Sequence, residues 1–110
     1  MEEMMEQLKE KYNVVHSEDN LPRELYTITS ADKLIKATVH DYDSFIEISI
    51  RTNDSAYNIF NSKAVKALIS SKKCMIIAAL GKRYKWRYNF YKLEKHEALM
   101  ILEEMMRIKV

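Results

Sequence analysis

The segment "CMIIAALGKRYKWRYNFYK", residues 74–92, carries the clearest structural signal in the chain. It opens with an apolar run over residues 74–80, and after Gly81 aromatic residues alternate with cationic ones. A short apolar run is typical of a buried inner strand, whereas alternation is typical of a strand with one dry and one solvated face. Gly81 and Lys82 fit a two-residue turn with glycine in its first central position. The segment therefore predicts a β-hairpin.

The aromatic side chains of this hairpin have two interpretations. A two-residue turn sets Ile77 opposite Trp86, and a three-residue turn would exchange the apolar partners but still leave the rings beside apolar neighbours. We therefore expect the rings to pack beneath a helix. The alternative is a platform whose rings, about 6.6 Å apart, stack on single-stranded bases. The two interpretations predict opposite burial for Trp86. The aromatic row consists of Tyr84, Trp86, Tyr88 and Phe90.

The cations of the hairpin point to the opposite face in either interpretation. Lysine and arginine on a rigid strand can hold phosphates at fixed spacing, and a neighbouring tyrosine can stack on a base or a sugar. The alternative is a solvated sheet face, on which such charges discourage pairing between sheet edges. The residues that we predict to bind nucleic acid are Lys82, Arg83, Lys85, Arg87 and Tyr91 on the hairpin, with Lys36 and Arg51 on neighbouring strands.

The rest of the chain alternates between helical and strand patterns. We expect helices at 2–12 and 94–110, a helix within 53–73 capped by Ser55 or restarted at Ser62, and strands at 25–30, 33–40, 45–52, 74–80 and 83–92. This pattern predicts one α+β domain over residues 1–110. It contains an antiparallel sheet of about five strands, with helices packed mainly on one face, in the order α-β-β-β-α-β-β-α.

The segment "DYDS" at 41–44 predicts a turn that pairs His40 with Phe45. One face of the two strands is then apolar, and the other is polar. The apolar face combines Ile35, Ala37 and Val39 with Ile50, Ile48 and Ile46. The polar face carries Lys36, Thr38, Glu47, Ser49 and Arg51.

Charge and cysteine content narrow the class of protein. Eighteen Lys and Arg against sixteen Asp and Glu give a net charge of +2, so only a local concentration of charge can attract nucleic acid. Cys74 is the sole cysteine, which excludes an intramolecular disulfide and fits a reducing cytoplasm. The N-terminal segment lacks the pattern of a signal peptide, and the run 74–80 is far shorter than a membrane span. We expect a cytoplasmic protein without a membrane partner.

No catalytic signature stands out in the sequence. His40, Asp41, Asp43 and Glu47 can be drawn as a divalent-metal site, but a tight turn selects aspartates for its own geometry. Glycine-rich phosphate loops and CxxC pairs are absent from the sequence. We therefore expect no enzyme, no metal and no cofactor.

The resulting hypothesis is a small non-enzymatic protein that binds single-stranded DNA or RNA through the basic hairpin face. No helix resembles a reader of the major groove, because the last one is apolar and acidic. The alternative is an adaptor or inhibitor that docks on a larger protein partner through the same basic face, against an acidic surface, or through Met-rich terminal helices.

Methionine is concentrated at the two ends of the chain. Six of the seven lie in the first five and the last eleven residues. The wide apolar stripe of the last helix predicts a homodimer formed through that helix. Intramolecular packing of the first helix on the last is the alternative, and the sequence favours neither.

Overall fold

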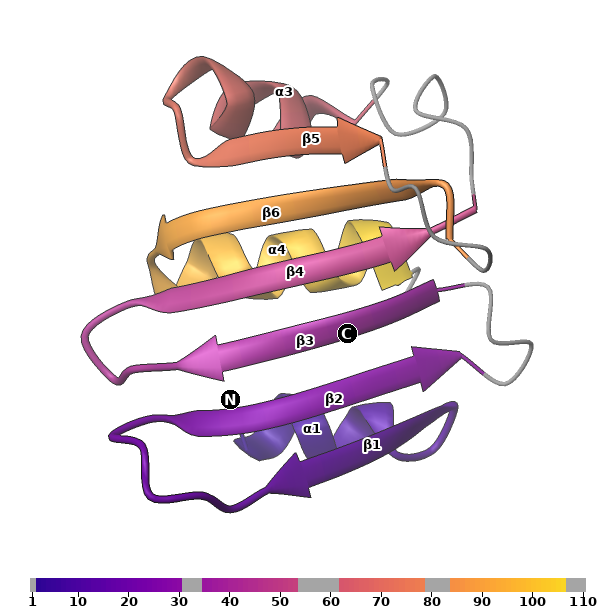
Figure 1. Cartoon of the computed structure of the whole chain (residues 1–110), viewed down its shortest axis with the longest axis vertical. Coiled ribbons are helices and arrows are strands. Elements are labelled where there is room, and N and C mark those ends of the chain that lie inside the picture. Colours follow the sequence, from indigo (N-terminus) through magenta and orange to yellow (C-terminus); the bar gives the residue numbers. More distant parts are fainter. Residues whose placement is uncertain (1, 31–34, 54–61, 79–83, 107–110) are drawn as a thin grey trace.

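A computed structural model describes residues 2–30, 35–53, 62–78 and 84–106. These residues form one antiparallel sheet of six strands and three helices (Figure 1). In chain order the elements are α1 Glu2–Leu8, β1 Tyr12–Ser17, β2 Glu24–Ser30, β3 Ile35–Asp41, β4 Ile46–Thr52, α3 Lys63–Ser70, β5 Cys74–Ala78, β6 Trp86–Leu93 and α4 Lys95–Met106. The predicted α+β class is confirmed.

The sheet has six strands rather than five because β1 was not predicted: it overlaps the expected helix at residue 12 and continues over residues 13–17, for which no element was expected. Tyr12 falls four residues after Leu8, which fits a helix, but α1 ends at Leu8. The β-branched pair Val14 and Val15 favours an extended backbone, and β1 pairs along its whole length with β2. Tertiary pairing thus ends the helix earlier than periodicity alone predicts.

The hairpin of β3 and β4 has the predicted faces but a different register. Asp41 pairs with Ile46, so the pairing is shifted by two residues from the predicted match of His40 with Phe45. The turn, moved by one residue to 42–45, is held by the Tyr42 N–H, which donates to the Phe45 carbonyl at 3.0 Å, and by stacking of the two rings. Because side chains alternate with period two, a shift of two leaves each residue on its predicted face.

The hairpin of β5 and β6 differs from the two-residue-turn prediction by one residue. Ile76 pairs with Tyr88 and Ile77 pairs with Arg87, which is the register expected for the longer turn. The turn itself, including Gly81, lies outside the described residues. A shift of one exchanges the faces of β5, so Ile76 packs against the core whereas Met75 and Ile77 are 55% and 40% exposed.

The prediction that residues 74–80 form an inner strand was wrong. The strand order is β1-β2-β3-β4-β6-β5, so β5 lies at the edge of the sheet (Figure 1). An apolar pattern on both faces suggests two covered faces, but here one of those faces is left exposed.

The helices cover one face of the sheet. In Figure 1, α1 lies behind β1 and β2, α4 lies behind β4 and β6, and α3 lies beside β5, where it also contacts α4. We call the opposite face, which carries Lys36, Arg51 and Arg87, the open face.

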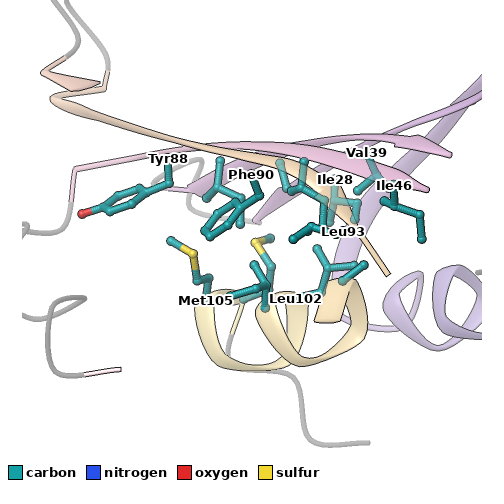
Figure 2. Packing of buried hydrophobic residues seen from close by; sticks show 14 of the residues in the cluster. Ile28, Val39, Ile46, Tyr88, Phe90, Leu93, Leu102 and Met105 are labelled. Atoms are coloured by element: carbon teal, nitrogen blue, oxygen red, sulfur yellow. The ribbon is translucent and has the colours of Figure 1, made fainter. Parts of the chain in front are cut away.

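Three residues of the aromatic row belong to the covered side. Tyr88 and Phe90 are buried, and Trp86 is partly buried against the core. Figure 2 shows Phe90 pointing from the sheet toward Leu102 and Met105 of α4. The interpretation as core is confirmed for these three rings, and a stacking platform is wrong for Tyr88 and Phe90.

A bulge interrupts β6 after Phe90. The pairing with β4 shifts between Ile46 and Ile48, and Lys92 has a positive φ of 48°. The extra residue lets Phe90 and Leu93, three positions apart, both reach the core, while Tyr91 is exposed.

The predicted helix within residues 53–73 is described only as α3. The side chain of Ser62 accepts a hydrogen bond from the Val65 N–H at 3.2 Å, so Ser62 is the N-cap. Ala64 and Leu68 of this helix are buried. The alternative cap Ser55 lies outside the described residues.

The Met-rich helices pack within the chain. Met4, Met5, Met105 and Met106 are buried on the covered side of the sheet, together with most of the apolar stripe of α4. The Tyr12 hydroxyl donates to the Met106 carbonyl and joins β1 to the end of α4. No helix in the described part of the chain is long and apolar enough to cross a membrane.

The register of β5 can be tested with two neighbouring isoleucines. We expect Ile76→Ala to lower the free energy of unfolding by about 2 kcal/mol, because it removes a side chain packed against the core. The loss in free energy of unfolding should be at least about 1 kcal/mol smaller for Ile77→Ala than for Ile76→Ala. The Ile77 side chain is half exposed, and the loss of strand propensity is common to both variants. Urea unfolding of the two variants measures the difference, and a larger cost at Ile77 would contradict the register.

Candidate nucleic-acid interface

Three cations lie side by side across the open face. Lys36 on β3 pairs with Arg51 on β4, and Arg51 pairs with Arg87 on β6. Neighbouring strands are about 4.8 Å apart, so the three residues form a line perpendicular to the strands. We call these three residues the basic row.

The described part of the chain supplies no carboxylate partner to the basic row. Within the described ranges, carboxylates form ion pairs with other cations, such as Arg23 with Asp19 and Lys73 with Glu97, but with none of the basic row. The Nε of Arg87 is buried and has no hydrogen-bond acceptor in the described part of the chain. Three positive charges and one unused buried donor therefore face the same side of the sheet.

This arrangement costs stability in the isolated protein. Like charges directly opposite each other on paired strands repel, and an unmatched buried donor loses its hydrogen bond to water. A bound anion offsets the first cost, because it screens the repulsion and accepts from guanidinium N–H groups that reach solvent. An extended polyanion that crosses β3, β4 and β6 matches a line of cations better than a single small anion does.

The row between the basic row and the turn of β3 and β4 carries no positive charge. The next residues along the strands on the same face form a row of uncharged polar side chains. In this row the Ser49 hydroxyl donates to Asn89 Oδ1 at 3.0 Å. Beyond them His40 lies opposite Glu47. Charge on the open face is therefore concentrated at the end that holds the basic row. The uncharged row consists of Thr27, Thr38, Ser49 and Asn89.

The remaining predicted site residues are placed differently. Lys85 is exposed just before β6, and its backbone N–H donates to Asn53 Oδ1 at 3.1 Å. Tyr91 is exposed in the bulge, four residues along β6 from Arg87, so it lies away from the basic row. Lys82 and Arg83 lie outside the described residues.

Two residues next to the basic row were not predicted as part of the site. Ile77 lies directly opposite Arg87, and Met75 lies opposite Asn89. The predicted two-residue turn placed both in the core. Only the one-residue difference in register brings them to the open face.

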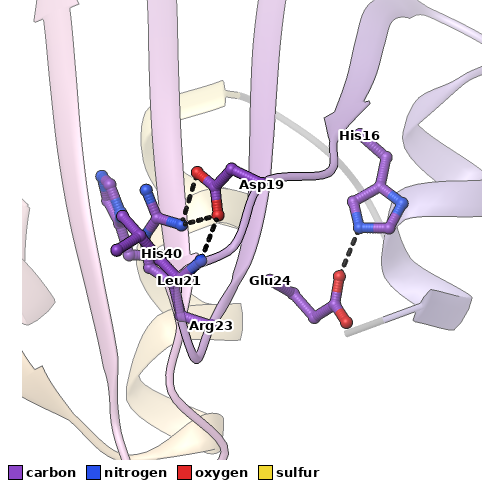
Figure 3. Close-up of polar contacts among 6 residues, drawn as sticks. All are labelled: His16, Asp19, Leu21, Arg23, Glu24 and His40. Atoms are coloured by element: carbon purple, nitrogen blue, oxygen red, sulfur yellow. Dashed lines mark hydrogen bonds and ion pairs between the residues drawn. The ribbon is translucent and has the colours of Figure 1, made fainter.

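A polar cluster occupies the far end of the sheet (Figure 3). Arg23 binds both carboxylate oxygens of Asp19 at 2.9 Å and donates from Nε to His40 Nδ1 at 2.9 Å. Burial, followed by the charge of Arg23, lowers the pKa of His40, so the ring stays neutral as an acceptor. The cluster lines a depression with several carboxylates, including Asp41 and Asp43.

The metal site considered for this region has no geometric support in the described residues. No group of three or more His, Cys, Asp or Glu side chains there could hold a metal ion. His40 is instead bound to Arg23, and the Asp41 carboxylate accepts from the Asp43 N–H at 2.9 Å within the turn.

Comparisons with models of protein families, with curated proteins and with solved structures find nothing that matches this chain. The geometry of the open face therefore carries the functional proposal.

Repulsion within the basic row can be measured as stability. We expect Arg51→Gln to raise the free energy of unfolding by roughly 0.2–1 kcal/mol at low salt, because it removes the central charge of the row. The gain should shrink at 1 M salt, where charges are screened over about 3 Å. Denaturant unfolding at both salt concentrations measures the effect. Lys66→Gln on α3 is the control for a change in net charge alone, and an equal gain in that variant would contradict repulsion within the row.

Proposed function

We propose that this chain is a small, non-enzymatic, cytoplasmic protein that binds single-stranded DNA or RNA across the open face of its sheet. The observation that carries the proposal is the basic row, three neighbouring cations without carboxylate partners in the described ranges. No described helix covers this face. Phosphate groups along one backbone would lie on Lys36, Arg51 and Arg87 in turn.

Single strands fit this surface better than duplex DNA. The major groove is about 12 Å wide and admits a helix or a two-stranded ribbon. Six strands at about 4.8 Å spacing extend over about 24 Å, so the open face cannot enter a groove. The longest described helix, α4, buries its apolar side chains against the sheet and carries Glu97, Glu103 and Glu104. An unpaired strand can instead lie flat across the sheet.

Charge removal at the basic row tests the proposal. The variant combines Lys36→Gln, Arg51→Gln and Arg87→Gln, and binding is measured by fluorescence anisotropy with a labelled 20-nucleotide single strand of DNA, the matching RNA and the DNA duplex. We expect the single-stranded ligands to lose affinity. The slope of log K against log salt should fall by about 2, because three phosphate contacts each contribute about 0.7 on single strands.

A second triple variant controls for net charge. Lys63→Gln, Lys66→Gln and Lys95→Gln remove the same three charges from exposed positions on α3 and α4. This control should keep most of the affinity. Equal losses in the two variants would mean that long-range attraction, not a site on the open face, accounts for binding.

Absence of binding by the unaltered protein would favour the adaptor hypothesis. The same basic row would then meet an acidic surface of a larger protein, where electrostatic complementarity mainly increases the rate of association. Co-purification of one stoichiometric protein that survives nuclease treatment would identify such a partner.

A homodimer formed through the last helix has less exposed apolar surface available than the sequence of that helix suggests. The apolar stripe of α4 is largely buried, and Met100 is the exposed large apolar residue of its described part. We still expect a dimer through this helix if Met100 and its neighbours meet a second copy. Sedimentation at high concentration measures the mass, and the mass of one chain would contradict the dimer.

A further inference from the structure

The basic row continues into an exposed apolar pair on β5. Ile77 lies directly opposite Arg87, one strand farther along the same line, and Met75 lies opposite Asn89 on the same face. The two side chains are 40% and 55% exposed. We call Met75 and Ile77 the apolar strip. It occupies the edge strand, next to the buried Nε of Arg87.

The fold does not explain the apolar strip. β5 contributes to the core through its other face, where Cys74 is buried and Ile76 packs against the cluster. Solvent-facing positions on an edge strand usually carry charges, which prevent pairing with other sheets. Methionine and isoleucine at these positions leave apolar surface in contact with water.

From this juxtaposition we propose that the apolar strip is the base-contacting part of the nucleic-acid site. The inference rests on the proposed function and makes it more specific. A nucleotide whose phosphate lies on Arg87 places its base one strand away, over Ile77 and Met75. Adjacent strands are about 4.8 Å apart, and alternate residues on one strand are about 6.6 Å apart, so the strip has the dimensions of a single base.

The chemistry of the strip selects unpaired bases. A base in a duplex is stacked between its neighbours, whereas an unpaired base can pack its apolar face against a protein. Methionine adapts its shape and its sulfur contacts aromatic rings favourably, and isoleucine provides a stiff, branched apolar side chain. Neither residue reads hydrogen-bond patterns, so contact is expected with any of the bases. The ligand class is therefore single-stranded nucleic acid without strong sequence preference.

The test combines Met75→Gln with Ile77→Thr, which preserves the branched β-carbon. The ligands are a 15-nucleotide oligothymidine, the same strand with abasic sites throughout, and a duplex of equal length. We expect the variant to bind oligothymidine about five- to tenfold more weakly, in line with the loss of one base contact. Its affinity for the abasic strand and its salt slope should not change. The unaltered protein should bind the abasic strand more weakly than oligothymidine. This comparison does not depend on the folding of any variant.

The matched control is Val15→Thr with Leu21→Gln. These residues are also exposed and apolar, but they lie on and beyond β1, at the other edge of the sheet. The control variant should bind all three ligands as the unaltered protein does.

The outcomes separate this inference from the function on which it rests. If the basic-row variant loses binding but the apolar-strip variant binds oligothymidine normally, the inference is overturned and the proposed function stands. If the unaltered protein binds no oligonucleotide, the proposed function fails first. Loss of self-association in the apolar-strip variant, with unchanged oligothymidine affinity, would show that a second copy of the chain covers the strip and would also overturn the inference.

Discussion

The burial of β6 against α4 is the constraint on which the rest of the structure depends. Tyr88 and Phe90 fill the space between the sheet and the helix, so this side of β6 cannot face water. Side chains alternate along a strand, and Arg87 is therefore forced to the opposite side. Pairing with β4 then brings Arg51 beside Arg87, and pairing of β4 with β3 adds Lys36. One hydrophobic contact thus places a row of cations on a face that no described helix covers.

The open face carries features that cost stability and that the proposed binding would explain. A protein under selection for stability alone would alternate charges across paired strands and would keep apolar side chains off an edge strand. Here three like charges are neighbours, a buried guanidinium nitrogen lacks an acceptor in the described ranges, and Met75 and Ile77 are exposed beside them. Such local departures are expected where a surface is shaped for a ligand. At the far end of the sheet, the carboxylate of Asp19 is paired with Arg23 instead.

The errors of sequence interpretation follow from the period of a strand. In the β3 and β4 hairpin the predicted register was wrong by two residues, and every side chain kept its face because the period is two. In the β5 and β6 hairpin the difference was one residue, which moved Ile77 from the core to the open face. The missing strand β1 has another cause. No element was expected over residues 13–17, and only pairing with β2 shows that these residues, with Tyr12, form a strand.

The sequence alone determined the α+β class and the faces of β3, β4 and β6, since each of these strands carries its own alternation of apolar and polar residues. It therefore also determined that Lys36, Arg51 and Arg87 point away from the core. Tertiary structure decided the order of the strands, the position of β5 at the edge and the exposure of Met75 and Ile77. These features depend on which strands become neighbours and on how many residues connect them. An apolar pattern on both faces, as in β5, contains no information on which face will be covered.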